Sequence, residues 1–260
     1  MLLRVATNAR RATVTLDRPG QRNALSIAML EELTRAFGDL AVEPDIRVVV
    51  LDAAGPDFCA GADFAELEQA RRDGSDGLDF DRPFRDALNS IAAHPVPVVA
   101  RVHGRALGGG CQLALACDLA VAAEDARLGI PSARLGIVIP IESIERLVSA
   151  VGPKRAGEML LAGAIVDGPQ AMAWGLVGRA VSSGELDGAV DEIAAAVVAA
   201  APLSIRAAKR GIGLVLQQRA ARRGRTGDFD MMAAAAFQSE DLAEGIRAFR
   251  ERRAPRFEGR

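Results

Sequence analysis

The hydrophobic and polar positions near the N-terminus follow two different periods. Residues 12–16, Ala-Thr-Val-Thr-Leu, alternate apolar and polar side chains, which predicts a half-buried strand. Between residues 26 and 40 the apolar side chains recur every three or four positions, at Leu30, Leu33, Phe37 and Leu40. That spacing predicts a helix with one buried face.

Three short apolar runs, residues 47–51, 96–102 and 119–122, predict strands that are covered on both faces. A helix is expected after Gly61, and the polar stretch over residues 72–81 is expected to be a mobile loop. Strands that alternate with helices indicate βαβ units, a largely parallel sheet and the α/β class.

The chain is expected to become mostly helical after about Gly152. Asp167 stands where it can cap a helix, with Pro169 in the first turn. Pro202 opens a further helix, and Ser239 begins the last one ahead of two acids that suit the positive end of a helix dipole.

Composition narrows the class of protein. The 260 residues are 50% hydrophobic and 25% charged, and the net charge of −2 gives no reason to expect a nucleic acid partner. Two histidines and three cysteines, with no C-x-x-C pair, give no reason to expect a metal site and suit a reducing compartment. No run of about 18 apolar residues predicts a membrane span, and the start lacks a long apolar signal segment. We therefore expect a cytoplasmic protein.

Two segments containing glycine lie where a predicted strand passes into a predicted helix. They are residues 55–63, Gly-Pro-Asp-Phe-Cys-Ala-Gly-Ala-Asp, and Gly108–Gly110. Backbone N–H groups at a helix start lack intrahelical acceptors and favour negative charge. Two such segments facing each other could hold one oxygen as it gains charge, which is an oxyanion hole. Taken singly, a glycine run is more often a tight turn between a strand and a helix.

Several motifs, in order along the chain, carry a family resemblance. They are Arg18-Pro19 with Asn23-Ala-Leu25, Phe58–Asp63, Gly104-x-Ala-Leu-Gly-Gly-Gly-Cys111, Cys117-Asp118, Pro131, Leu135-Gly136, Arg146-Leu147, Gly175–Val177 and Phe249-x-x-x-Arg-x-Pro-x-Phe257. From about residue 10 to 257 the chain resembles the crotonase superfamily, and within it the enoyl-CoA hydratase/isomerase family.

The resemblance implies a crotonase (ClpP-like) fold. A ββα-spiral core with the acyl-CoA site is expected over residues 1–195, followed by a C-terminal helical trimerisation region over residues 196–260. The implied partner is an acyl-CoA thioester, and the implied assembly is a homotrimer or a dimer of trimers. No cofactor is expected other than coenzyme A as part of the substrate.

The resemblance also assigns candidate site residues. The backbone N–H groups of Ala62 and Gly109 would hold the thioester oxygen and stabilise an enolate. Arg22 and Arg252 are candidate contacts for the phosphates of coenzyme A, with solvated surface charges as the alternative. The other expected coenzyme A contacts are Ala60, Gly61, Asp63, Gly108 and Phe249.

Hydratases of this family use two glutamates to activate a water and deliver its protons. The corresponding positions here are Gln112 and Ser132, and neither an amide nor an unassisted hydroxyl acts as a general base near pH 7. Some family isomerases carry their acid in the segment that contains Glu142, which makes it the candidate replacement. The alternative for Glu142 is an N-terminal helix acid that stabilises the helix dipole.

Two functions follow from these residues. One is an acyl-CoA lyase or isomerase of the enoyl-CoA hydratase family, for which standard two-glutamate hydration is not expected. The alternative is a non-catalytic acyl-CoA-binding protein with the crotonase fold in fatty-acid metabolism. A third possibility is another reaction on the same oxyanion hole, such as thioester hydrolysis, decarboxylation or C–C cleavage.

Overall fold

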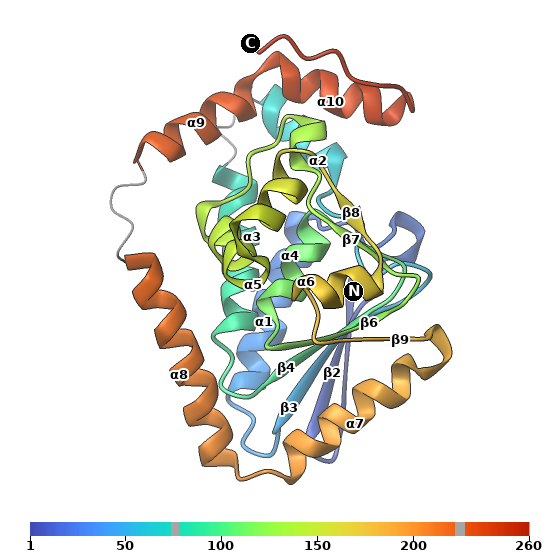
Figure 1. The fold of residues 1–260 in the computed structure, drawn as a ribbon, viewed down its shortest axis with the longest axis vertical. Coiled ribbons are helices and arrows are strands. Elements are labelled where there is room, and N and C mark those ends of the chain that lie inside the picture. The colour runs from blue at the N-terminus through green and yellow to red at the C-terminus, as the bar shows by residue number, and fades with distance from the viewer. Residues whose placement is uncertain (74–77, 222–226, 260) are drawn as a thin grey trace.

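The structure is a computed structural model that describes residues 1–73, 78–221 and 227–259, and two sheets lie at its centre (Figure 1). The larger has the order β1-β2-β3-β4-β6-β9, and only the β1–β2 pair is antiparallel. In the smaller, β5 pairs parallel with β7, and β7 pairs antiparallel with β8. The strands are β1 Leu3–Asn8, β2 Arg11–Leu16, β3 Val48–Ala53, β4 Val98–Val102, β5 Arg105–Leu107, β6 Leu119–Ala123, β7 Arg127–Gly129, β8 Ile165–Val166 and β9 Arg179–Val181.

Helices follow most of the strands and make up nearly all of the C-terminal part. The α-helices are α1 Ile27–Ala41, α2 Phe64–Arg72, α3 Leu78–Ala92, α4 Gly109–Ala116, α5 Ile141–Leu160, α6 Gly168–Trp174, α7 Leu186–Ala199, α8 Pro202–Ala221, α9 Gly227–Gln238 and α10 Glu240–Arg250. Short 3₁₀ helices are η1 Pro19–Gln21, η2 Ser132–Leu135 and η3 Ser183–Glu185.

The strand predicted at residues 47–51 and the helix cap predicted at Asp167 are confirmed. The apolar run at 47–51 forms β3, in which five of the six residues are buried, because the sheet is covered on both faces. Ser26 caps α1 by accepting a hydrogen bond from the Met29 N–H at 3.2 Å. Asp167 caps α6 in the same way, through the Gln170 N–H at 2.9 Å. Each side chain satisfies one of the N–H groups that a helix start leaves unpaired.

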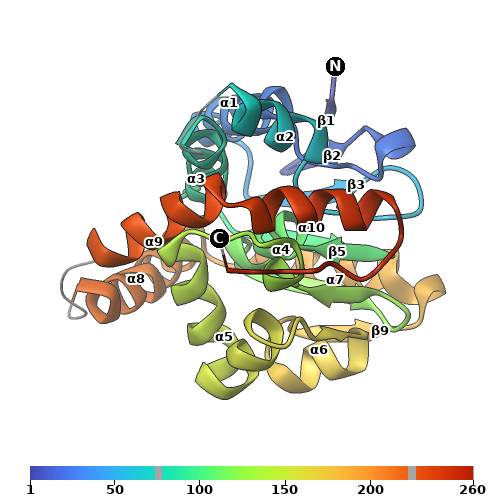
Figure 2. The same ribbon diagram turned by 90° about the horizontal axis from the view of Figure 1, so that it is seen from above.

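Helices cover the larger sheet on both sides. Figure 1 shows α1, α3 and α4 grouped on one side, while α7 packs on β3, β4 and β6 from the other. From α7 the chain continues as α8, which runs along the outside of the molecule toward α9. Seen from above, α10 crosses over α4 and β5 (Figure 2). The C-terminal helices therefore return to the side of the core where β5 passes into α4.

The expectation of a loop over residues 72–81 is wrong for its last part. Helix α3 begins at Leu78, and its face packs on α1 and α4. Residues 74–77 lie outside the described residues. The proposed division into residues 1–195 and 196–260 falls inside α7, and it stays a prediction.

Among the helices of the described ranges, none alone has both the length and the hydropathy to cross a membrane. The segments Leu186–Ala199 and Pro202–Leu216 meet both conditions only as a pair that is bent by 111° at its break.

Candidate active site

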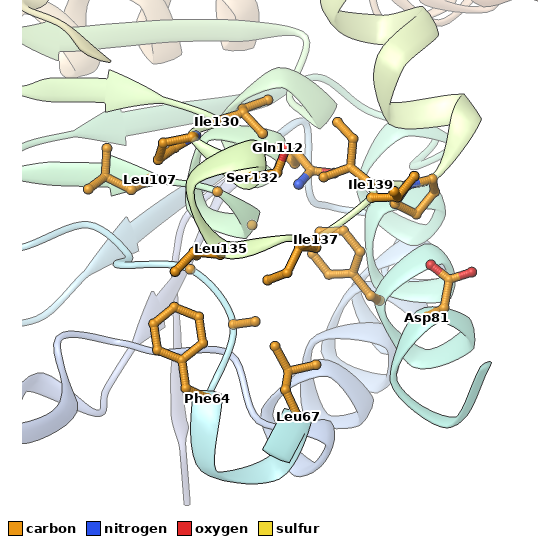
Figure 3. A pocket seen from close by; sticks show the side chains of 18 of the residues that line it. Phe64, Leu67, Asp81, Leu107, Gln112, Ile130, Ser132, Leu135, Ile137 and Ile139 are labelled. Carbon is orange, nitrogen blue, oxygen red and sulfur yellow. The ribbon is translucent and has the colours of Figure 1, made fainter. Parts of the chain in front are cut away.

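A cavity of about 590 Å³ opens between α2, α3, the start of α4, the segment 130–142 and the C-terminal helices. Figure 3 shows its walls, which are mostly aliphatic and aromatic with few polar groups among them. Water is a poor competitor in such surroundings, so each polar group here interacts strongly with a bound molecule. The apolar lining includes Phe64, Leu67, Phe84, Leu107, Ile130, Leu135, Ile137 and Ile139.

The two glycine-containing segments meet at one wall of this cavity. Strand β5 pairs with the first segment, since the Cys59 N–H donates to Arg105 O at 2.9 Å and the Leu107 N–H donates to Cys59 O at 3.0 Å. Gly61 has a φ of 110°, and a Cβ there would lie 3.1 Å from Leu107 O and 3.8 Å from the Gly109 nitrogen. Glycine is therefore required by both the backbone conformation and the close approach of the two segments.

The N–H groups of Ala62 and Gly109 stay outside the backbone pairing. Leu25 bridges the residues on either side of Ala62, because its N–H donates to Gly61 O at 2.8 Å and its carbonyl accepts from the Asp63 N–H at 2.9 Å. Gly109 is the first residue of α4, where helix N–H groups have no preceding carbonyl. Within the described ranges neither amide has a protein acceptor, and both residues line the cavity. Two adjacent donors at a helix start can hold an oxygen that gains negative charge.

Gln112 and Ser132, the two positions where the family's hydratases carry acids, both line the same cavity. Gln112 lies in α4 with 4% of its surface exposed, and within the described ranges its Oε1 has no hydrogen-bond partner. Figure 3 shows its side-chain amide at the cavity wall near Ser132. Both side chains can donate hydrogen bonds to a substrate, and neither can serve as an unassisted general base near neutral pH.

Glu142 reaches the cavity from the first turn of α5. Its Oε1 lies 3.6 Å from Nη1 of Arg85, and Nη2 of Arg85 lies 2.7 Å from Oδ2 of Asp81. Arg85 and Asp81 also line the cavity, and both were missed in the sequence. Their spacing of four residues is the helical ion-pair signal, but residue 81 fell in the stretch expected to be a loop.

Five of the seven expected coenzyme A contacts line the cavity: Arg22, Ala60, Gly61, Gly108 and Phe249. Asp63 instead caps α2 by accepting from the Ala65 N–H at 2.9 Å, and it pairs with Arg18 at 2.7 Å. Arg252 is exposed beyond the end of α10 and is not part of the lining. Roles for these two residues in coenzyme A binding stay predictions.

A further arginine at the cavity, Arg105, was also missed. Asp57 Oδ1 accepts from both its Nε, at 2.8 Å, and its backbone N–H, at 3.0 Å. Burial raises the pKa of the Asp57 carboxyl, but the Arg105 hydrogen bonds and the charges of Arg105 and Arg22 outweigh it and hold that pKa below its usual value. An ionised Asp57 therefore fixes Arg105 beside the first glycine-containing segment.

The C-terminal helices are tied to the wall of the cavity through α2. The rings of Phe64 and Phe249 meet edge to face with centroids 4.9 Å apart, and Arg71 pairs with Glu240 at 2.9 Å. The tail then folds back on α10, because Glu244 accepts from Arg253. Arg253, the arginine of the C-terminal sequence motif, is thus held by an internal pair.

Clusters of possible metal ligands and the state of the Cys111 thiol can be described for the part of the chain that the structure covers. In the described part of the chain no three His, Cys, Asp or Glu side chains form a group that could hold a metal ion. Burial raises the pKa of the Cys111 thiol to about 12, so the thiol stays protonated at neutral pH.

Comparison with known proteins shows the family to which the chain belongs. The family model described as enoyl-CoA hydratase/isomerase matches residues 7–260. A Thermus thermophilus protein, classed by its name among enoyl-CoA hydratases, is 39% identical and aligns over 95% of this chain and 96% of its own length. The mouse protein named enoyl-CoA hydratase domain-containing protein 2, mitochondrial, is 36% identical over 95% of this chain and 84% of its own.

A solved structure gives the same result for the fold. Methylmalonyl-CoA decarboxylase in complex with 2-nitronate-propionyl-CoA superposes with a TM-score of 0.89, at 27% identity, over 100% of this chain and 99% of that one. The fold is that of the crotonase superfamily. The chain belongs to the enoyl-CoA hydratase/isomerase family of that superfamily.

Proposed function

We propose that the chain is an enzyme that binds an acyl-CoA thioester and stabilises its enolate through the N–H groups of Ala62 and Gly109. The observation that carries the proposal is the pair of unengaged amides at the wall of an apolar cavity. Charge that develops on a thioester oxygen in such surroundings interacts strongly with fixed donors, and losing one such donor typically costs about 10²–10³-fold in rate.

Proton transfer is assigned to Glu142. Hydration in the family needs two acids, whereas a double-bond shift needs one group that takes a proton from one carbon and returns it to another. Glu142 lines the cavity, while Gln112 and Ser132 stand at the positions of the two acids. This combination favours a reaction with one proton-transferring carboxylate, such as isomerisation of an enoyl-CoA.

Decarboxylation is a second candidate. Breaking the bond between the α-carbon and a carboxylate of a malonyl-type thioester leaves the electron pair in an enolate, so it requires no general base. Gln112 and Ser132 can donate neutral hydrogen bonds to such a carboxylate inside the cavity. The similarity to methylmalonyl-CoA decarboxylase supports keeping this candidate.

Coenzyme A is proposed to lie along Ala60, Gly61 and Gly108, with Arg22 near its phosphates and Phe249 at the edge. The assembly is proposed to be a homotrimer or a dimer of trimers, formed through the C-terminal helices. Exposed apolar side chains on α8, among them Leu203, Ile212 and Val215, support this assembly. Sedimentation equilibrium tests it, and a monomer at micromolar concentration argues against it.

The experiment is mass spectrometry of a panel of saturated, unsaturated and malonyl-type acyl-CoAs incubated with the protein in heavy water. Deuterium uptake reports an enolate, gain of a water reports hydration, and loss of carbon dioxide reports decarboxylation. Ala62→Pro removes an N–H that makes no backbone bond, and we expect it to slow the reaction about 10²–10³-fold. Ala62→Gly keeps the N–H and serves as the control. If every thioester that binds returns unchanged, the protein binds acyl-CoA without catalysis.

A further inference from the structure

One ion cluster joins α3 to α5 at the rim of the cavity. The guanidinium of Arg85 lies between two carboxylates, 2.7 Å from Asp81 Oδ2 and 3.6 Å from Glu142 Oε1. The Arg85 side chain is 40% exposed and that of Glu142 is 45% exposed. Water screens a pair at this exposure, so its contribution to the stability of the fold is small. The place that the pair gives the Glu142 carboxylate at the cavity does not depend on this contribution.

The two oxygens of Glu142 have different surroundings. Oε1 faces Arg85, whereas Oε2 is buried and has no hydrogen-bond partner in the described part of the chain. A buried carboxylate oxygen without a partner is costly, and native proteins rarely keep one without a reason. Glu142 as a residue lines the cavity together with Ala62, Gly109 and Gln112, although its Oε2 is closed off by the protein. The contact with Arg85 is made by the other oxygen, Oε1.

We propose that Arg85 is a positioning residue for Glu142. It faces Oε1 and holds the Glu142 carboxylate at the cavity, where that carboxylate accepts a proton from the α- or γ-carbon of the acyl group. The electron pair of the broken C–H bond goes into the enolate. The carboxyl exchanges its proton with solvent, and a proton or deuteron returns from it to carbon when the enolate collapses. Asp81 keeps the guanidinium in place. This inference rests on the proposed function and specifies how its proton step is arranged.

Arg146, another cation near Glu142, is bound to a different partner. On its own helix, Arg146 donates to Asn89 Oδ1 at 2.9 Å, and burial lowers the pKa of Arg146 although Glu142 and Glu145 raise it. From α3 the facing charges are Asp81 and Arg85. Removing Arg85 therefore leaves Glu142 facing Asp81 and Glu145, with Arg146 bound to Asn89. That variant lacks the cation that holds the Glu142 carboxylate in place.

The experiment measures deuterium exchange of an acyl-CoA that the unmodified protein labels. For Arg85→Met we expect the exchange rate near neutral pH to fall about tenfold. The dissociation constant of the acyl-CoA should stay within about twofold, because Arg85 acts through Glu142. Arg85→Lys keeps a cation facing Glu142 and should recover most of the rate. Asp81→Asn removes the partner that holds the guanidinium and should lower the rate less than Arg85→Met does.

Each outcome decides between the claims. If Arg85→Met keeps the rate of the unmodified protein while Glu142→Gln loses exchange, the role of Arg85 is overturned and the proposed function stands. A bound acyl-CoA panel that the unmodified protein never labels overturns both. If Arg85→Met does not fold, Arg85→Gln and Arg85→Lys decide: a rate lost in the first and kept in the second supports the proposal, and equal rates in both overturn it.

Discussion

The two ends of the cavity are built in different ways. At one end, the N–H groups of Ala62 and Gly109 belong to buried backbone that is fixed by strand pairing and by a helix start. At the other, Arg85 and Glu142 reach across from two helices, and both side chains are near half exposed. The first end can be altered only by disturbing the fold, whereas the second can be altered by exchanging one side chain. A chain of this kind can thus keep the two unengaged amides while the side chains at the other end change.

Glu142→Gln is expected to have the largest effect, and it acts on the side-chain end alone. The amide keeps the shape of the side chain but cannot take a proton, so deuterium exchange should fall roughly 10²–10⁴-fold. Acyl-CoA binding, measured by calorimetry, should stay within about twofold because the oxyanion hole is untouched. Glu145→Gln, one residue before Arg146 on the same helix, is the matched control and should keep the rate. Exchange at the unmodified rate in Glu142→Gln would exclude this carboxyl as the proton group.

Gly110→Ala tests the backbone end. A Cβ at this position would lie 2.2 Å from Cys59 O and 2.8 Å from Cys59 Cβ, so α4 or the first glycine-containing segment must move. We expect the free energy of unfolding to fall by about 3 kcal/mol, with loss of exchange as well. Urea unfolding followed by circular dichroism measures the change.

Gly188→Ala is the control for that substitution. Gly188 lies exposed in α7, and no atom comes within 4 Å of an added Cβ. Alanine should leave the stability unchanged or raise it by up to about 1 kcal/mol, since glycine is the poorer helix former. Equal losses in both variants would mean that the contact of Gly110 with Cys59 is not what requires glycine.

The same contrast explains what the sequence could predict. The run at 47–51 and the spacing of Leu30, Leu33 and Phe37 identified β3 and α1, because burial on fixed faces leaves a period in the chain. The family motifs located the two glycine-containing segments, since close backbone approach restricts those positions to glycine.

Contacts between side chains of distant elements leave no such period in the sequence. The expected loop ran to residue 81, and no helix was predicted between it and the strand at 96–102, although Phe84, Leu88 and Ile91 recur there at helical spacing. The pairing of Arg85 with Glu142 joins two helices more than fifty residues apart, and local spacing carries no record of it. The small sheet of β5, β7 and β8 was missed for a related reason, because strands of two or three residues are too short to show alternation.

Acid should destabilise the fold through His94 at a higher pH than through Asp57. His94, just beyond α3, is buried, and burial lowers its pKa from 6.5 to about 4, with the Lys209 charge adding to the effect. The unfolded chain therefore takes up a proton between about pH 6.5 and 4 that the folded chain does not. Stability should fall as pH falls through that window, by an amount on the order of 2 kcal/mol at pH 5. Unfolding free energies of the unmodified protein and His94→Gln at pH 7 and pH 5 measure it; equal pH dependence in both would contradict the assignment.

Asp57 gives the smallest expected effect, and it acts at the backbone end in a lower pH range. Its pKa in the fold lies below the usual 3.8, so its contribution to stability is present above about that pH and is lost as pH falls through the folded value. Arg105 is 42% exposed, so solvent screening reduces the size of the contribution. Asp57→Asn should therefore be less stable than the unmodified protein at pH 7, and the difference should shrink only below about pH 4. A difference that already disappears between pH 6.5 and 4 would contradict the assignment of this effect to Asp57.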